Sequence, residues 1–140
     1  MEIKVVHTGK MKFTMQAREH IIETDQPVES GGENSAMTPP EIFLAALGSC
    51  AAFYAAQYLA IRKLADTGVE VSVEAEKLRE PARLGNFTIH VKSPVPLTGE
   101  QNQAMERAVH RCLIHQTMLQ VPRIHIAVHA EQPDAVSTTG

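Results

Sequence analysis

The chain opens with an alternation of apolar and polar residues, and its first 24 residues contain three short β-rich segments that predict three strands. The segments 3–7, 12–16 and 20–24 are rich in β-branched residues and are separated by turn-like breaks. We expect them to form an antiparallel meander. The thirteen residues that follow, 25–37, are rich in Gly, Ser, Asn and Asp and show no period. A connection of that length is typical of a functional or mobile loop.

A long apolar run over residues 41–57 predicts the main helix of the protein. Thr38 is the candidate N-cap, two prolines follow it in the first turn, and Gly68 is the expected stop signal. Residues 42–61 carry no charge and are long enough to span a membrane. The stretch is rich in alanine, however, so the free energy gained by inserting it into a membrane is small. We therefore expect a buried helix. A small domain can bury such a helix only between two layers or against a second subunit, which suggests a homodimer.

The second half of the chain is predicted to form a strand pair followed by a second helix. Alternation over 69–76 and a second β-rich segment at 87–92 predict a strand pair, with residues 81–85 as its turn. Residues 98–101, Thr-Gly-Glu-Gln, are typical of a capping box that opens a second helix. The apolar stripe of that helix is Met105, Ala108, Val109 and Cys112.

A last strand is expected at residues 123–129, followed by a polar tail at 131–140. The predicted order is thus β-β-β-α-β-β-α-β, in which strands are grouped and do not alternate one for one with helices. This grouping favours an α+β fold over a doubly wound sheet. We expect one domain over residues 1–130.

Composition limits the partners and the location of the protein. With 140 residues and 44% hydrophobic content, the chain can bury one core, and with 4% aromatic residues that core must be largely aliphatic. A net charge of -3 gives no electrostatic signature for nucleic acid or a membrane surface, so we expect neither partner. The N-terminus lacks the layout of a signal peptide, and a cytoplasmic location is expected.

The two cysteines, Cys50 and Cys112, are both predicted to lie on apolar helix faces. In the cytoplasm such thiols are more often reduced, catalytic or inert than joined in a structural disulfide. Paired thiol chemistry is one interpretation. The other is that both side chains are small buried hydrophobic groups, since free cysteine is among the most buried residue types.

The histidines do not form a convincing metal site, and we expect no metal. His110 lies two residues before Cys112, about 200° away around a helix, so the two cannot share a face. His125 and His129 share a strand face but are separated by roughly 13 Å. His115 is expected to be a partly exposed polar residue, with tuning of the Cys112 thiol as the alternative.

The segment from Thr38 to Cys50, Thr-Pro-Pro-Glu-Ile-Phe-Leu-Ala-Ala-Leu-Gly-Ser-Cys, closely resembles a segment of the OsmC family, the osmotically induced and organic-hydroperoxide-resistance proteins. In that family it reads Thr-Pro-x-Glu-Leu-Leu-Leu-Ala-x-Leu-Gly-x-Cys. Weaker matches are Arg18-Glu-His20, Asp25-Gln-Pro27, Gly31-Gly32 and Cys112-Leu-Ile-His115. The resemblance covers nearly the whole chain. It implies antiparallel sheets wrapped around central helices in an intertwined homodimer.

The resemblance also implies a mechanism, the thiol-dependent reduction of organic hydroperoxides. By analogy Cys50 would be the attacking thiolate and Cys112 the resolving thiol, with a Cys50–Cys112 disulfide as product. No bound cofactor is expected, because an external dithiol, lipoyl in some family members, would restore the thiols. Apolar residues on the helix face of Cys50 would bind alkyl or fatty peroxides, namely Phe43, Leu47, Phe53 and Tyr54, together with Ala46.

A thiol in apolar surroundings needs a stabilising group, because burial raises the pKa of a cysteine. The resemblance implies Arg18 as that cation, held by Glu41 at the start of the main helix. Glu41 lies nine residues before Cys50, whereas the dedicated peroxidases have their glutamate ten before, a rotation of about 100°. The alternative role for Glu41 is a first-turn acid that complements the helix dipole. Together with Leu113, where proline is common, this departure indicates the OsmC-like branch of the family.

Three functions stay open from the sequence. The first is a peroxidase that acts on organic hydroperoxides. The second is a redox-responsive or stress-induced protein that binds an apolar small molecule without efficient turnover. The third is a structural dimer with inert cysteines.

Overall fold

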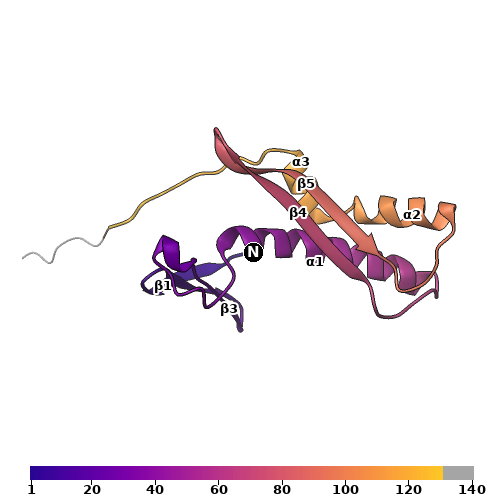
Figure 1. The fold of residues 1–140 in the computed structure, drawn as a ribbon, viewed down its shortest axis with the longest axis horizontal. Coiled ribbons are helices and arrows are strands. Elements are labelled where there is room, and N and C mark those ends of the chain that lie inside the picture. The colour runs from indigo at the N-terminus through magenta and orange to yellow at the C-terminus, as the bar shows by residue number, and fades with distance from the viewer. Residues whose placement is uncertain (131–140) are drawn as a thin grey trace, which may run out of the picture.

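A computed structural model describes residues 1–130, which open with a three-stranded sheet at one end of the molecule (Figure 1). Its strands are β1 (Lys4–Gly9), β2 (Lys12–Ala17) and β3 (His20–Thr24), paired antiparallel in the order β1-β2-β3. The predicted meander is confirmed. Its first turn uses Gly9 and Lys10, which both have positive φ.

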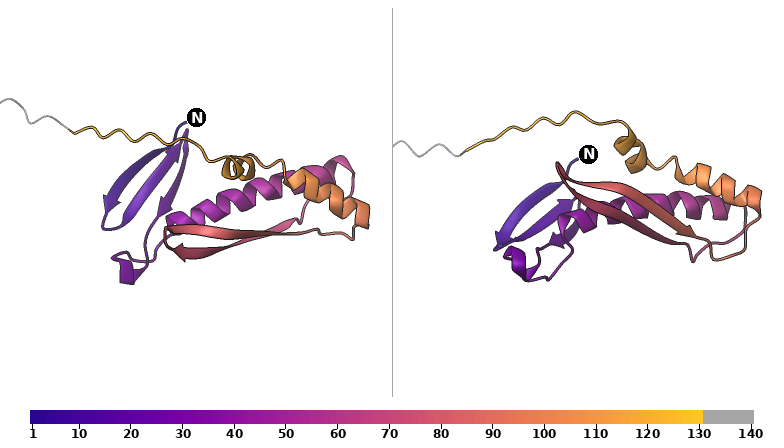
Figure 2. Two further views of the ribbon diagram at one scale, coloured as in Figure 1. Left: turned by 90° about the horizontal axis from the view of Figure 1, so that it is seen from above. Right: turned by 45° about the horizontal axis from the view of Figure 1, so that its top comes forward.

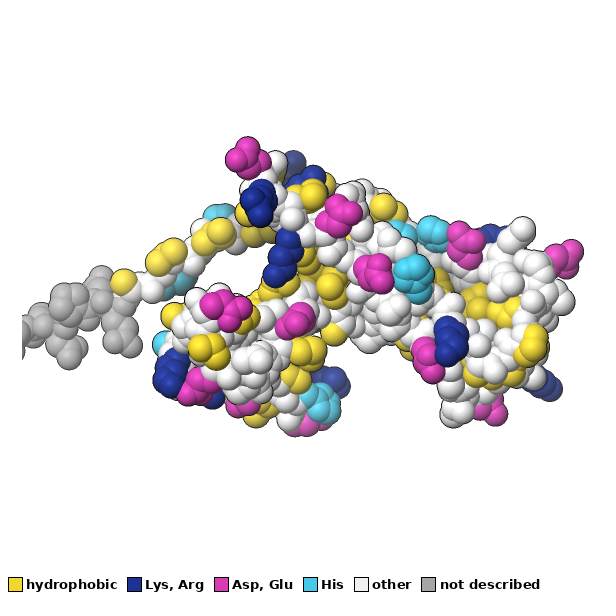
Figure 3. Space-filling view, viewed as in Figure 1, with side chains coloured by type: hydrophobic (Ala, Val, Ile, Leu, Met, Phe, Trp, Pro, Cys, Tyr) yellow, Lys and Arg dark blue, Asp and Glu magenta, His cyan; other side chains and the backbone are white. Residues whose placement is uncertain are grey.

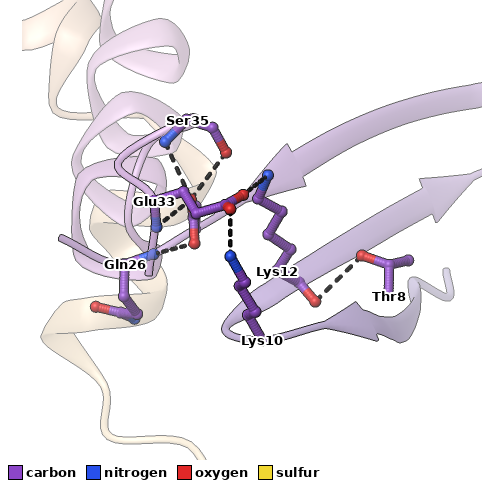
Figure 4. Close-up of polar contacts among 7 residues, drawn as sticks. Thr8, Lys10, Lys12, Gln26, Glu33 and Ser35 are labelled. Carbon is purple, nitrogen blue, oxygen red and sulfur yellow. Dashed lines mark hydrogen bonds and ion pairs between the residues drawn. The ribbon is translucent and has the colours of Figure 1, made fainter. Parts of the chain in front are cut away.

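The loop that follows β3 is organised around the carboxylate of Asp25, whose side chain is fully buried. The loop contains the short 3-10 helix η1 (Val28–Ser30). Backbone N–H groups of Gln26, Glu33 and Ser35 donate to the carboxylate at 2.8–3.0 Å, and so does the Ser35 hydroxyl at 2.8 Å (Figure 4). The loop is therefore folded around one anion, although its sequence shows no period.

Replacement of Asp25 by asparagine should destabilise the protein. The hydrogen bonds from Ser35, Gln26 and Glu33 outweigh burial and hold the pKa of Asp25 well below its usual range. An amide would present an N–H group to donors that need an acceptor, so we expect Tm to fall by roughly 5–10 °C. Because the folded pKa is depressed, this stabilisation is present above pH ~4 and is lost as the pH falls further.

Thermal unfolding at pH 7 measures this effect, and Glu33→Gln provides the control. Glu33 forms exposed ion pairs with Lys10 and Lys12 at the edge of the same loop (Figure 4). Exposed pairs contribute little to stability, so Tm of this variant should change by far less. Equal Tm values for Asp25→Asn and wild type would show that the carboxylate does not organise the loop.

The main helix, α1 (Pro39–Ile61), begins at the predicted cap. Glu41 accepts hydrogen bonds from the backbone N–H of Thr38 at 2.7 Å and from its hydroxyl at 2.8 Å. The predicted end near Gly68 was wrong, because the helix stops at Ile61. Lys63 there adopts the left-handed conformation, with φ of 55°, and the N–H of Leu64 bonds to the Leu59 carbonyl at 2.9 Å. This arrangement is a Schellman ending in which lysine replaces the usual glycine.

A long hairpin packs along α1 (Figure 2). Its strands are β4 (Glu70–Arg79) and β5 (Ala82–Lys92), paired antiparallel. The predicted turn at 81–85 was wrong, since the turn occupies residues 80 and 81 and both strands continue to it. A Cβ on Gly48 would lie 3.1 Å from Val73 Cγ2, so glycine lets α1 approach β4 closely.

The second helix, α2 (Gly99–Val109), begins with the predicted capping box of Thr98 and Gln101. The prediction that Cys112 belongs to this helix was wrong. The chain turns after Val109, and Cys112 is the N-cap of a further helix, α3 (Leu113–Leu119), which the sequence pattern did not indicate. Cys112 is nevertheless fully buried, as the apolar stripe predicted.

The predicted last strand at 123–129 was wrong for the single chain. Residues 121–130 form no regular structure and run away from α3 without a neighbouring strand (Figure 1). A strand needs an adjacent edge for its backbone hydrogen bonds, and the isolated segment has none. The observed order is therefore β-β-β-α-β-β-α-α, and the fold is α+β with two antiparallel sheets. The predicted polar tail, 131–140, lies outside the described residues.

The core lies between α1, α2 and the hairpin, and it is built from aliphatic and small side chains. On α1 the buried residues recur every four positions and form one stripe. The buried apolar residues of the described chain are Leu47, Ala51, Ala55, Leu59, Met105, Ala108 and Cys112. Cys112 belongs to this core, and α3, which it caps, contacts the cysteine-bearing helix α1.

Candidate functional site

The two thiols lie side by side. Cys50 is in the middle of α1 and Cys112 caps α3, and the two helices are in contact. The Cys112 thiol lies near enough to Cys50 to lower its pKa, and both cysteines are free thiols. Cys112 is fully buried, whereas Cys50 is partly exposed. The arrangement therefore presents one accessible sulfur backed by a second, protected one.

The Cys112 thiol and the first turn of α3 lower the pKa of Cys50. Burial alone would raise the pKa of this thiol, but the neighbouring Cys112 thiol and the backbone N–H groups of Ile114 and Leu113 lower it. These donors favour the thiolate, and the pKa of Cys50 lies below the usual range as a result. The first N–H groups of a helix have no partner within the helix, so they are free to serve an anion.

Cys112 has the opposite tendency. Burial and the hydrogen bond with Cys50 raise its pKa, although the N–H groups of His115 and Ile114 act against this rise. The His115 N–H donates to the Cys112 sulfur at 3.5 Å. The pair thus consists of a partly exposed Cys50, whose pKa is lowered, and a buried Cys112, whose pKa is raised, which is the division of roles that thiol–disulfide chemistry requires.

A cavity of about 480 Å³ adjoins the thiol pair between the hairpin, α2 and α3. Its lining is mainly apolar and is drawn from four elements. The lining residues are Leu47, Phe87, Ile89, Val91, Asn102, Met105, Glu106, Val109, His110, His115 and Met118. Neither sulfur lines the cavity, but two lining residues are neighbours of the thiols. Leu47 lies one helical turn before Cys50, and the backbone N–H of His115 donates a hydrogen bond to the Cys112 sulfur.

The four apolar residues that were predicted to bind the substrate lie in different places in the structure. Leu47 lines the cavity and is buried. Phe43 instead packs edge to face with Phe87, with ring centroids 6.1 Å apart, and it stays partly exposed. Phe53 packs against Tyr54 and lines a separate hollow beside the start of the hairpin. Of the four predicted residues, Leu47 is the one that lines the cavity beside the thiols.

Arg18 and Glu41 do not meet at the thiols in the single chain. Arg18 is exposed in the turn between β2 and β3, where its carbonyl accepts a hydrogen bond from Gln16 at 2.8 Å. Glu41 caps α1, and the hydrogen bonds from Thr38 hold its pKa below the usual range. The groups that lower the pKa of Cys50 within residues 1–130 are the Cys112 thiol and backbone amides, and they include no cation.

His115 is the site residue with an unexplained polar atom. Its Nδ1 is buried and has no hydrogen-bond partner within the described chain. Its ring lies 5.3 Å from that of His110, and both line the cavity. Within residues 1–130 no group of three or more His, Cys, Asp or Glu side chains is arranged to hold a metal ion.

The sequence profile of the OsmC family, described as OsmC-like protein, matches residues 32–129. This span includes both cysteines and all the elements that carry the thiol site. The chain therefore belongs to the OsmC family. No curated protein sequence matches it.

Solved structures share the fold. An osmotic stress induced and detoxification response protein from Psychrobacter arcticus aligns with a TM-score of 0.75 at 18% identity, over 82% of this chain and 85% of its own. An OsmC-like protein from Mycoplasma pneumoniae aligns with a TM-score of 0.71 at 18% identity, over 86% and 87%. An organic hydroperoxide resistance protein from Legionella pneumophila aligns with a TM-score of 0.57 at 18% identity, over 84% and 87%.

Proposed function

We propose that the protein is a cytoplasmic, thiol-dependent peroxidase that reduces organic hydroperoxides. The observation that carries the proposal is the contact between Cys50, whose pKa is lowered, and the protonated, buried Cys112. Membership of the OsmC family, some of whose solved structures are named organic hydroperoxide resistance proteins, supports the same reaction class.

The proposed reaction proceeds in two steps. The Cys50 thiolate attacks one peroxide oxygen, the O–O bond breaks, and the products are a Cys50 sulfenic acid and an alkoxide that takes a proton to become the alcohol. The Cys112 thiol then attacks the sulfenic sulfur, which forms the disulfide and releases water. An external dithiol, such as a lipoyl group, reduces the disulfide and returns both thiols. The contact between the sulfurs favours condensation over further oxidation.

The apolar cavity supports an organic substrate in place of hydrogen peroxide. Its walls are mostly aliphatic and aromatic, and it adjoins the thiol pair through Leu47 and His115. Burial of an alkyl chain contributes about 0.8 kcal/mol per CH₂ group, so longer peroxides should be preferred. A substrate or a second subunit would cover the other apolar side chains of α1 that were predicted to bind the peroxide, namely Phe43, Phe53 and Tyr54.

We also propose that the protein is a homodimer. α1 is long and apolar enough to cross a membrane, yet only 22% of its most apolar window is buried within the chain. Figure 3 shows hydrophobic side chains along the C-terminal segment before the grey tail and in the recess beside the first sheet. A second copy would cover these surfaces.

Arg18 and Glu41 stay predictions, and they have a role in this proposal only in the assembled dimer. If Arg18 there approaches Cys50, Arg18→Ala should shift the alkylation-rate profile of Cys50 to higher pH. The wild-type profile itself should lie at lower pH than that of an ordinary thiol, because the pKa of Cys50 is lowered. Iodoacetamide kinetics across pH 5–10 measure both. An unchanged profile in Arg18→Ala would show that Arg18 does not stabilise the Cys50 thiolate, and the Cys112 thiol and the α3 amides would then be the stabilising groups.

A peroxide-consumption assay tests the proposed reaction. The reduced protein is mixed with cumene hydroperoxide or tert-butyl hydroperoxide and a dithiol, and consumption is followed over many equivalents. Multiple turnovers support the peroxidase. One equivalent of oxidation without turnover supports instead the redox-responsive binding protein, whose apolar ligand the cavity beside the thiols could hold. If the thiols do not react with the peroxide, the result supports the third function, a structural dimer with inert cysteines.

A further inference from the structure

Three arginines line one surface hollow where the end of α1 meets α2. Arg62 is the C-cap of α1, Arg107 lies in the last turn of α2, and Arg111 follows that helix. The hollow has a volume of about 410 Å³, and its remaining lining is Tyr58, Ala104 and Ala108. It contains no carboxylate. Within residues 1–130, no acidic group lies within 4.0 Å of any of the three guanidinium groups.

The hollow continues into a second one of about 420 Å³. The two share Tyr58, Arg62, Ala104 and Arg107, so they form one groove, which we call the arginine groove. Its far end adds Glu100, Gln101 and Gln103. The groove therefore has a basic end and an end that offers amide donors and acceptors with one carboxylate.

The helix dipoles do not account for this arrangement. A cation at the C-terminal end of a helix is favourable, which explains Arg62 and Arg107 one at a time. It does not explain why three guanidinium groups line the same hollow in a chain whose net charge is -3, since like charges repel. Arg62 also lies 5.7 Å above the ring of Tyr58, a cation–π contact that restricts its position. A bound anion would relieve the repulsion.

Phosphate is the anion that fits these groups. Guanidinium groups bind phosphate through paired N–H donors, and three positive charges match a dianionic phosphate, while Glu100 is the one carboxylate that lines the groove. The groove is far larger than a phosphate ion, and its other end is polar. We infer that the arginine groove binds a phosphomonoester of a polar molecule, such as a nucleotide or a sugar phosphate, with the phosphate at Arg62, Arg107 and Arg111.

Calorimetric titration at low salt tests this site with three probes, namely AMP, glucose 6-phosphate and inorganic phosphate. At least one ester should bind, and more tightly than inorganic phosphate. Arg62→Gln and Arg107→Gln should each weaken that binding about tenfold or more. Arg79→Gln, which removes an exposed arginine at the tip of the hairpin, should leave it unchanged. Arg111 is avoided because it adjoins Cys112 in the chain.

The result is independent of the thiol chemistry, because Cys50→Ser should bind the same ester with the same affinity. Adenosine and glucose, which lack the phosphate, should not bind. The inference is overturned if none of the anions binds, if inorganic phosphate binds as tightly as both esters, or if Arg79→Gln weakens binding as much as Arg107→Gln. A change of oligomeric state in the arginine variants without loss of ester binding would also overturn it.

Discussion

Cys50→Ser should reduce peroxide turnover by roughly 1,000-fold or more. Cys50 is the partly exposed sulfur, and the α3 amides and the Cys112 thiol favour its thiolate. A serine hydroxyl stays protonated at neutral pH and cannot form a sulfenic acid, so neither step of the proposed reaction remains. Steady-state consumption of cumene hydroperoxide with excess dithiol measures the loss.

Two variants serve as controls for this loss. Ser49→Ala changes the neighbouring exposed residue, whose hydroxyl donates to the Ala46 carbonyl at 3.1 Å, and turnover should stay within about twofold. Cys112→Ser should still react once with peroxide, but the sulfenic acid then lacks its partner and oxidises further. Full turnover in Cys50→Ser would show that Cys50 is not the attacking thiol.

Ile126→Asp should convert the protein from a dimer to a monomer. Ile124, Ile126 and Val128 alternate along the C-terminal segment and are 80–88% exposed in the single chain. Such a segment can satisfy its backbone and its apolar side chains by pairing with the sheet edge of a second copy, and a buried aspartate would oppose this pairing. Light scattering at micromolar concentration should give about 30 kDa for wild type and about 15 kDa for the variant.

His125→Asp is the matched control, because its side chain lies on the opposite face of an extended segment. The mass of this variant should stay near 30 kDa. A wild-type mass near 15 kDa would contradict the dimer, and a dimeric Ile126→Asp would show that the C-terminal segment does not form the interface.

Local patterns predicted much of the fold. The β-rich segments of β1 to β4, the N-cap at Thr38 and the capping box at Thr98 depend on neighbouring residues alone, and the structure confirms them. The end of α1 was mispredicted because Lys63, which gives no stop signal, takes the left-handed position. The final strand was mispredicted because alternation indicates a strand but does not supply the edge with which it pairs.

The sequence predicted the two thiols of the site but little of what surrounds them. The sequence indicated both cysteines and the cavity residue Leu47, but not the group that acts on Cys50 within the chain. Beside the Cys112 thiol, that group is the first turn of α3, with the backbone N–H groups of Ile114 and Leu113. Backbone amides carry no signature of residue type, and cysteine is not a preferred N-cap, so nothing in the pattern indicated a helix that starts at the second thiol.

Peptide mapping of the oxidised protein tests the central claim most directly. The reduced protein is treated with one equivalent of tert-butyl hydroperoxide, alkylated, digested without reductant and analysed by mass spectrometry. The contact between the sulfurs predicts an intramolecular disulfide between Cys50 and Cys112 as the main product, with one water released. Recovery of Cys112 as a free thiol beside a sulfinic or sulfonic acid at Cys50 would contradict the claim.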